Sequence, residues 1–502
     1  MAHDPQAGPE PGGSHGPVDV LDTEEAGGRI IRGGALRTLA FVSGTLASLV
    51  AAALLFRHLG VDDTGRYATV LSLIAIAGGM SDAGVMALGL REYSTLEGAA
   101  RDAVMRNLLG MRLAFTAAGV VAATVFAVIV GYGPTMVAGT ALAGFGFLLY
   151  MVQQFLSVPL SVGLRLGWVA ALQFLTQFLA AVVFSLLVFA GAGLLPFLAV
   201  QIPVMLILIA ITAHLVRGEM PLRPAFVLRQ WRSMFRDVLV FAVILALGVL
   251  YFRVITVLLS LLSTDRETGY YGAAFRVIEV LAAVPSLLAG SAFPLLSRAA
   301  RDDRNRLGYA LDRLTRGMML VGIWMAICVV LGAPVAIDVV AGPAFFPSIE
   351  LLQYLGVALA ATFVLITWSL GLLAAREHKA MLIANSVALV VAVGGGALLI
   401  SIDGARGGAI ALVVAEFTLA SGYGIAIARH PELTPLDPRH VARVALAAAA
   451  ALAVPWALDL PAVADVLLGT AVYAVMLVVL RAIPEEIAEA FTSRVRHRGA
   501  AG

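Results

Sequence analysis

Three charged side chains, Arg253, Arg276 and Glu279, stand inside long apolar stretches of the sequence. A charge in the middle of a lipid bilayer costs at least about 2.5 kcal/mol, so each of them needs a reason. At about 1.5 Å of rise per helical residue, Arg253 lies about 16 Å, Arg276 about 10 Å and Glu279 about 15 Å from the predicted outer ends of their helices. Arg276 and Glu279 share one helix face. The spacing predicts a central site where two guanidinium groups bind an anion, and the alternative is an ion pair that only locks two helices.

Two more acids, Asp82 and Glu416, also lie in apolar sequence. A protonatable carboxylate that faces a cavity could couple the movement of a substrate to that of H+ or Na+. The competing interpretation is helix capping, or packing against a polar neighbour.

Four charged residues flank the predicted helix ends and are candidates for gates. Arg57 and Arg66 border the first outer loop, where ordinary interfacial arginines compete with an outer gate. Arg91 and Glu92 border an inner end, where a gating salt bridge competes with a plain cytoplasmic anchor.

The elements that must position these residues follow from composition. Of the 502 residues, 60% are hydrophobic and 13% are charged, with a mean hydropathy of +0.94. A soluble domain carries about a quarter charged residues. One soluble core cannot hide so much apolar sequence, which predicts an all-α polytopic membrane protein. The net charge of +2 gives no indication of nucleic-acid binding, and the single cysteine, Cys328, excludes a disulfide framework.

Stretches of about 20 apolar residues predict about fourteen transmembrane helices. They lie near residues 35–56, 67–90, 107–131, 134–158, 168–190, 193–215, 234–262, 270–296, 317–341, 347–374, 380–401, 407–428, 441–459 and 463–483.

The basic residues predict the orientation, because Lys and Arg concentrate on the cytoplasmic side. Of the 34 Lys and Arg residues, four lie in the predicted outer loops and two lie within spans, while the rest lie in inner segments. Both termini are therefore expected in the cytoplasm. The outer loops are too short for an extramembrane catalytic domain, and no G-x-x-x-x-G-K-[ST] loop for ATP is present. These features favour a transporter rather than an enzyme.

An internal repeat divides the chain. Thr64-Gly65-Arg66-Tyr67 corresponds to Thr268-Gly269-Tyr270-Tyr271, and two later landmarks recur at offsets of 213 and 211 residues, close to this offset of 204. Chance recurrence among 50 glycines is the alternative. A parallel repeat of this kind brackets a central substrate site. The predicted parts are a disordered tail (1–28), two six-helix lobes (29–216 and 234–428) joined by a basic linker (217–233), an extra helix pair (429–483) and a second tail (484–502).

Several short motifs carry a family resemblance over roughly residues 30–430. They are Phe56-Arg57-His58-Leu59-Gly60, Ser81-Asp82-Ala83-Gly84, Leu90-Arg91-Glu92-Tyr93, Gly269 to Arg276, Phe293 to Arg298, and Gly404 to Ala411. The chain thereby resembles the polysaccharide-biosynthesis (Wzx-type) flippases of the multidrug/oligosaccharidyl-lipid/polysaccharide exporter superfamily.

The resemblance implies a flippase of a bacterial cell membrane that moves polyprenyl-pyrophosphate-linked oligosaccharide from the inner to the outer leaflet. Arg253 and Arg276 would then bind the pyrophosphate, and Glu279 would hold both arginines when no substrate is present. It implies no cofactor beyond H+ or Na+ coupling, a monomer, and glycosyltransferases and a polysaccharide polymerase as partners.

Alternatives to this function are a cation-coupled multidrug or small-molecule exporter of the same superfamily and a non-transporting scaffold. A peptidoglycan-precursor flippase would typically have a more basic cavity. Uncharged polar residues also lie within the predicted helices, where such groups join helices more often than they meet sugar hydroxyls: Gln153, Gln154, Gln173, Gln177 and Asn385.

Overall fold

The computed structural model describes residues 24–82, 84–221, 223–289, 296, 304–430, 433, 437–458 and 460–483. Within these ranges, side chains are described except at 24–42, 80–82, 232–241 and 304–305. Most of the predicted N-terminal tail, the predicted C-terminal tail and the side chain of Asp82 therefore lie outside the described part of the chain.

Throughout the described residues, the elements are helices. Those of the first half are α1 (Glu24–Asp82), α2 (Val85–Thr95), α3 (Gly98–Ile129), α4 (Pro134–Leu156), α5 (Val158–Val162), α6 (Leu166–Phe189), α7 (Leu194–Ala199) and α8 (Gln201–Leu215). Those of the second half are α9 (Leu228–Leu262), α10 (Asp265–Leu281), α12 (Arg304–Val340), the short 3-10 helix η2 (Pro343–Phe345), α13 (Ser348–Ala374), α14 (His378–Ala428), α15 (Pro438–Leu458) and α16 (Ala462–Val479). The prediction of an all-α polytopic membrane protein is confirmed.

Twelve helices in the described part are long and apolar enough to cross a membrane. Two of them are bent. α1 leaves helical geometry at Gly60 (φ 74°, ψ −176°), and α14 leaves it at Asp403 and Gly404 (φ 50°, ψ −129° at Gly404). A positive φ costs glycine little, which explains the residue at each bend. Both halves of α1 line one cavity, so the chain turns back at Gly60. Each bent helix thus supplies two of the fourteen predicted spans, and the predicted loops there shrink to one or two residues.

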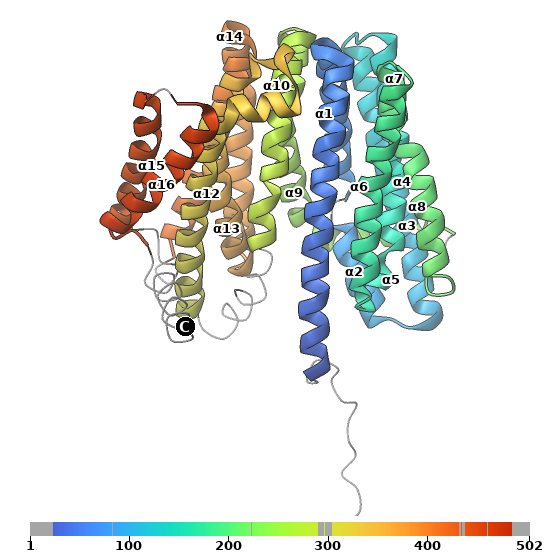
Figure 1. Cartoon of the computed structure of the whole chain (residues 1–502). Helices are drawn as coiled ribbons and strands as arrows, with labels where there is room; N and C mark the ends of the chain where they lie inside the picture. Colours follow the sequence, from blue (N-terminus) through green and yellow to red (C-terminus); the bar gives the residue numbers. More distant parts are fainter. Residues whose placement is uncertain are drawn as a thin grey trace, which may run out of the picture.

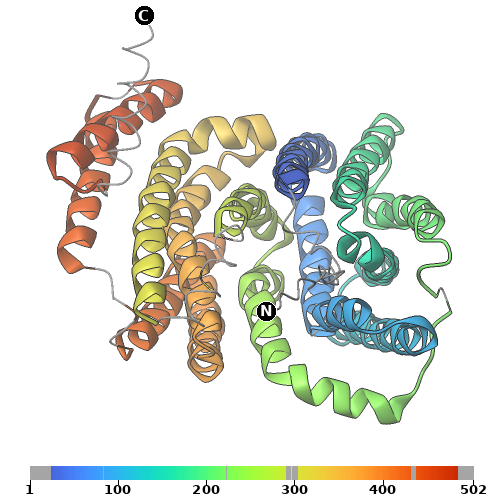
Figure 2. The same ribbon diagram turned by 90° about the horizontal axis from the view of Figure 1, so that it is seen from below.

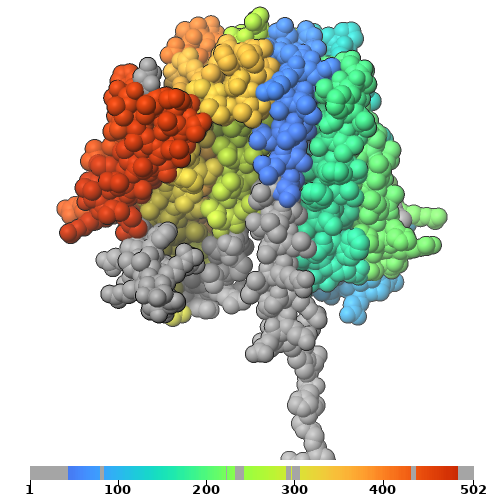
Figure 3. Space-filling view, in the orientation of Figure 1, coloured from blue at the N-terminus to red at the C-terminus, as the bar shows by residue number. Residues whose placement is uncertain are grey.

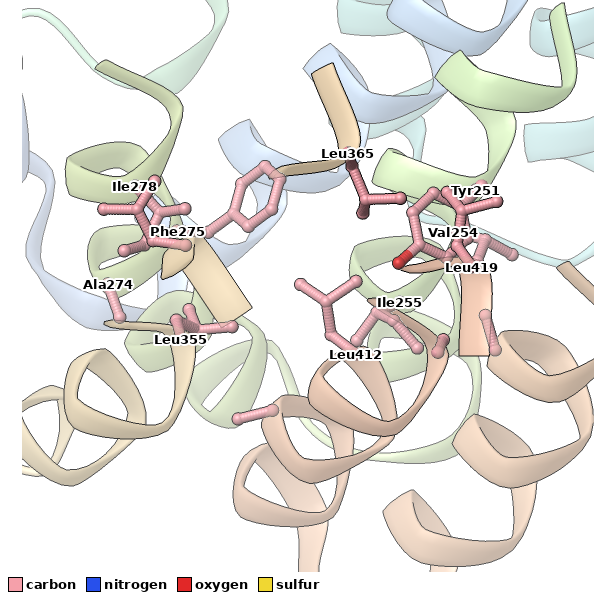
Figure 4. Packing of buried hydrophobic residues seen from close by; sticks show 14 of the residues in the cluster. Tyr251, Val254, Ile255, Ala274, Phe275, Ile278, Leu355, Leu365, Leu412 and Leu419 are labelled. Carbon is pink, nitrogen blue, oxygen red and sulfur yellow. The ribbon is translucent and has the colours of Figure 1, made fainter. Parts of the chain in front are cut away.

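The helices form two lobes, the first from α1–α8 and the second from α9–α14, with α15 and α16 packed outside the second (Figures 1 and 2). The largest cluster of buried hydrophobic side chains joins α9, α10, α12, α13 and α14. Figure 4 shows its centre, where Phe275 and Ile278 of α10 lie near Leu355 of α13. The residue boundaries predicted for the lobes stay predictions.

The outer surface of the helices is largely apolar, as a lipid-facing surface must be. Phe189 at the end of α6 is 87% exposed and Trp456 on α15 is 86% exposed. Figure 3 shows the helices side by side in one broad body, with α15 and α16 at its edge.

The segment between the lobes and the start of α9 run along the edge of the molecule from the first lobe to the second, as the view from below shows (Figure 2). It is held against α3 by hydrogen bonds. The Ala225 backbone N–H donates to the Arg106 carbonyl at 2.8 Å, and the side-chain oxygen of Asn107 accepts from the Val227 N–H at 3.0 Å and from Trp231 Nε1 at 2.7 Å. The predicted basic linker is thus docked on the first lobe.

Candidate functional site: a charged cavity between the lobes

A cavity of about 190 Å³ lies between the lobes. The first lobe contributes both halves of α1, one face of α6 and Gln201 of α8, and the second lobe contributes α9 and α10. The charged and polar residues that line it are Ser48, Tyr67, Ser72, Gln177, Gln201, Arg253, Thr256, Arg276 and Glu279.

The three charged residues singled out in the sequence meet on the second-lobe wall of this cavity. Arg253 of α9 donates to Glu279 Oε1, and Arg276 Nη1 donates to Glu279 Oε2 at 2.7 Å. The other terminal nitrogen of Arg276 reaches across to the hydroxyl of Ser48 on α1. One carboxylate therefore links two guanidinium groups, and one of these also contacts the first lobe.

The cluster carries one net positive charge in a poorly solvated place. The side chains of Arg253, Arg276 and Glu279 are 19%, 32% and 26% exposed. The Arg253 guanidinium also lies 5.4 Å from the ring centroid of Phe275, a distance that permits a cation–π contact. An anion that enters the cavity can replace the carboxylate as the partner of the guanidinium groups, because both present oxygen acceptors in the same geometry.

At the predicted outer face, the second half of α1 crosses α10 at very short range. A Cβ on Gly65 would overlap the Asp265 carbonyl, and a Cβ on Gly269 would overlap the Val61 carbonyl. Val61 and Asp265, like Gly65 and Gly269, stand 204 residues apart, so the contact is reciprocal between the two copies of the repeat.

Arg57 and Arg66 also join the lobes at the predicted outer face. Arg66 pairs with Asp265 of α10 at 2.8 Å and with Asp63 of its own helix at 3.0 Å. Arg57 donates to the carbonyl oxygens of Asp338 (2.7 Å) and Val339 at the end of α12. Their positions suit an outer gate, which stays a prediction.

Three other candidates, Arg91, Glu92 and Glu416, are not among the residues that line the cavity. Arg91 and Glu92 pair with each other on α2 at 2.6 Å. Glu416 is 4% exposed within the second lobe, beside Tyr251 of α9 and Thr362 of α13, and is not one of the lining residues. The side chain of Asp82 lies outside the described part. The gate and coupling roles of these four residues stay predictions.

Sequence reasoning did not single out Ser48, Gln201 or Asp265. Ser48 and Gln201 are polar residues in spans, a signal that a search for charges overlooks. The repeat offset makes Asp265 the counterpart of Val61, so the sequence did indicate that these positions correspond. The offset does not indicate that the two copies of the repeat are in contact.

Comparison with known proteins fits this architecture. A solved structure described as the lipid II flippase MurJ in an inward closed conformation superposes with a TM-score of 0.73 at 14% identity, over 89% of this chain and 99% of that chain. A multidrug resistance MATE family transporter of the MOP superfamily, in an inward-facing conformation, superposes with a TM-score of 0.61 at 16% identity, over 79% of this chain and 98% of that chain. These likenesses establish the fold. No curated protein matches the chain significantly.

The chain thus shares its fold with solved structures of a lipid flippase and of a multidrug transporter. A family model described as polysaccharide biosynthesis protein matches residues 54–350, more than half of the sequence. The chain belongs to this family of polysaccharide biosynthesis proteins. The resemblance predicted from the sequence motifs is confirmed.

Proposed function

We propose that the protein is a flippase that moves polyprenyl-pyrophosphate-linked oligosaccharide from the inner to the outer leaflet of a bacterial cell membrane, for the biosynthesis of a cell-surface polysaccharide. The observation that carries the proposal is the pair of guanidinium groups, Arg253 and Arg276, in the cavity between the lobes. Guanidinium forks bind phosphate oxygens by paired hydrogen bonds. Glu279 keeps both forks in place and yields them to the pyrophosphate.

Transport follows from the arrangement of the two lobes. The Gly65–Asp265 crossing brings the two lobes into backbone contact at the predicted outer face, and in this proposal it closes the cavity there. Rocking of two parallel repeats about a central site would open this crossing and close the opposite side. A substrate bound between α1 and α10 is then exposed to each leaflet in turn, without a chemical step. The shared fold of a lipid II flippase supports this cycle.

The proposed function includes an orientation in the membrane, an oligomeric state, partners and a driving force. Both termini lie in the cytoplasm, and the protein works as a monomer beside glycosyltransferases and a polysaccharide polymerase. H+ or Na+ provides the driving force, with Asp82 and Glu416 as candidate coupling groups.

The proposal is tested with the full-length protein in proteoliposomes that contain a fluorescent undecaprenyl-pyrophosphate-linked oligosaccharide. The wild type should move the lipid between leaflets, and Arg253→Ala and Arg276→Ala should each abolish this movement at unchanged protein level. The matched control is Arg406→Ala, because Arg406 pairs with the exposed Glu350 away from the cavity. Full movement by both cavity variants would refute the binding role of the two arginines.

A cation-coupled multidrug exporter is the competing function, since a MATE transporter shares the fold. A strain that lacks the protein separates the two. The flippase predicts accumulation of lipid-linked sugars on the inner leaflet, whereas the exporter predicts drug sensitivity without that accumulation.

A further inference from the structure

A second cavity, of about 380 Å³, opens inside the first lobe between α4, α6 and α8. Eight of its ten lining residues carry uncharged hydrogen-bonding side chains, and none of the ten is charged. Four are the glutamines Gln153, Gln154, Gln173 and Gln177, and the structure adds Gln201. The residues that the sequence scatters over three helices thus face one space.

Joining of helices explains only part of this cluster. Gln153 is 4% exposed and donates to Thr212 of α8 at 3.2 Å, which ties α4 to α8. Gln154 donates to the hydroxyl of Tyr150 on its own helix at 2.8 Å. In contrast, the side-chain amides of Gln173, Gln177 and Gln201 make no hydrogen bond within the described part of the chain.

None of these three side chains is buried: Gln173 is exposed and Gln177 and Gln201 are partly exposed, so their amides are open to a ligand that enters the cavity. The α6 residues Gln173 and Gln177 are one helical turn apart and point into the same cavity. The Cβ of Gln201 packs against Gly146 of α4, where a Cβ added to the glycine would lie 2.7 Å from it. All three glutamines therefore line the space between α4, α6 and α8.

The two cavities adjoin. Gln177 and Gln201 line both the neutral cavity and the charged cavity that holds Arg253 and Arg276. In a polyprenyl-pyrophosphate-linked glycan, the first sugar is attached directly to the phosphate. A pyrophosphate held by the arginines therefore places its first sugar next to Gln177 and Gln201.

We propose that the glutamine-lined cavity of the first lobe is the glycan-binding subsite and that it selects uncharged sugars. The inference rests on the proposed flippase function and names its substrate class. An amide both donates and accepts hydrogen bonds, as a sugar hydroxyl does, so the two groups are complementary. A uronic acid would bring an ionised carboxylate into a cavity with no cation to pair it, which disfavours acidic glycans. The first lobe thus recognises the glycan, and the second lobe holds the anion.

The test measures binding of two probes to the full-length protein in nanodiscs: bare undecaprenyl pyrophosphate, and the same lipid bearing a neutral hexose disaccharide. The double variant Gln173→Leu and Gln177→Leu removes two amides and keeps the helix apolar. We expect its affinity for the sugar-bearing lipid to fall about tenfold or more, as the loss of two hydrogen bonds implies, while its affinity for the bare lipid is unchanged. Gln201→Leu, on a different helix, is the second variant and should act in the same direction.

The control is Ser185→Ala on the same helix α6, because Ser185 bonds only to the Ala181 carbonyl of its own helix and lines neither cavity. A third probe, the lipid bearing a uronic acid, should bind the wild type more weakly than the neutral one. Equal losses for the bare and the sugar-bearing lipid, or no loss for either, would overturn the glycan subsite alone. Failure of the wild type to bind any of the three lipids would instead overturn the flippase function itself.

Discussion

Arg253 on α9 and Glu279 on α10 form an ion pair in the wall of the central cavity, and Glu279 gives its second oxygen to Arg276. The Glu279 carboxylate pairs with both guanidinium groups and so offsets the repulsion between their like charges. It is the only anion of this three-residue cluster, so its charge and its pairing determine whether the two arginines can bind another anion.

Removal of that carboxylate charge should therefore make the thermal stability of the protein depend on an added anion. Glu279→Gln leaves two guanidinium groups facing each other, and breaking a buried pair costs up to about 3–5 kcal/mol, less here because the cluster is partly hydrated. We expect a lower Tm for the variant in detergent and a larger rise of Tm with undecaprenyl pyrophosphate than in the wild type. Thermal unfolding with and without the lipid measures both.

Glu350→Gln serves as the control for this change, because Glu350 also pairs with an arginine, Arg406, but is 53% exposed. Its Tm should stay near that of the wild type, since exposed pairs contribute little. A Tm of Glu279→Gln that does not respond to the lipid would show that the cluster only locks two helices.

The Gly65–Asp265 crossing should tolerate no side chain. In Gly65→Leu, the new side chain would collide with the α10 backbone, and the two helices would have to separate. We expect the cavity to open toward the predicted outer face. With Cys328→Ala as background, a cysteine at Ala181 in the cavity wall should react faster with a membrane-impermeant maleimide added from that side.

The matched control for the crossing is Gly394→Leu on α14, because a Cβ at Gly394 has nothing within 4 Å. It should leave the labelling rate of the cysteine unchanged. Unchanged labelling in Gly65→Leu as well would contradict a closing role for the crossing.

The ion pair between Arg66 and Asp265 should contribute only a small part of the free energy that keeps the cavity closed at the predicted outer face. Both side chains are more than a third exposed, and such pairs typically contribute about 0.2–1 kcal/mol. A double-mutant cycle with Arg66→Ala and Asp265→Ala, read out by the same labelling assay, should give a coupling free energy in this range that decreases with salt. A coupling well above it would assign the closed state to the ion pair rather than to the glycine contact.

The docked linker should depend on Asn107. Its side chain accepts two hydrogen bonds from the linker region and donates one to Gln230 at 2.8 Å. Asn107→Ala leaves these groups without their partner, at a cost of about 1–3 kcal/mol. We expect faster proteolysis within residues 217–230, and Thr95→Ala, whose hydroxyl bonds only within its own helix α2, should not change the rate. An unchanged rate in Asn107→Ala would show that the linker is held by other contacts.

The sequence could predict the charged site because depth in a membrane can be counted. Arg253 and Glu279 were placed at the same level on consecutive helices, and consecutive helices are usually neighbours, so their contact followed from arithmetic. The spans followed from apolar length in the same way, although the loops expected at Gly60 and Gly404 proved to be sharp kinks, each of one or two non-helical residues between two helices.

The rest could not be predicted because it depends on packing between helices distant in sequence. The glutamines of α4 and α6 were visible, but nothing in one sequence says that α4 faces α6 across a cavity, or that Gln201 joins them. Likewise, the repeat singled out Gly65 and Gly269 without showing that each would meet the backbone of the other copy.

The reciprocal contact of Gly65 with Asp265 and of Gly269 with Val61 has the symmetry of an isologous homodimer interface, contained within one polypeptide. In a homodimer, a substitution in the sequence appears in both subunits of the interface. In a single chain that contains both halves, a substitution appears in one half only. Fusion therefore allows each half to change its residues separately: one copy carries Arg66 where the other carries Tyr270.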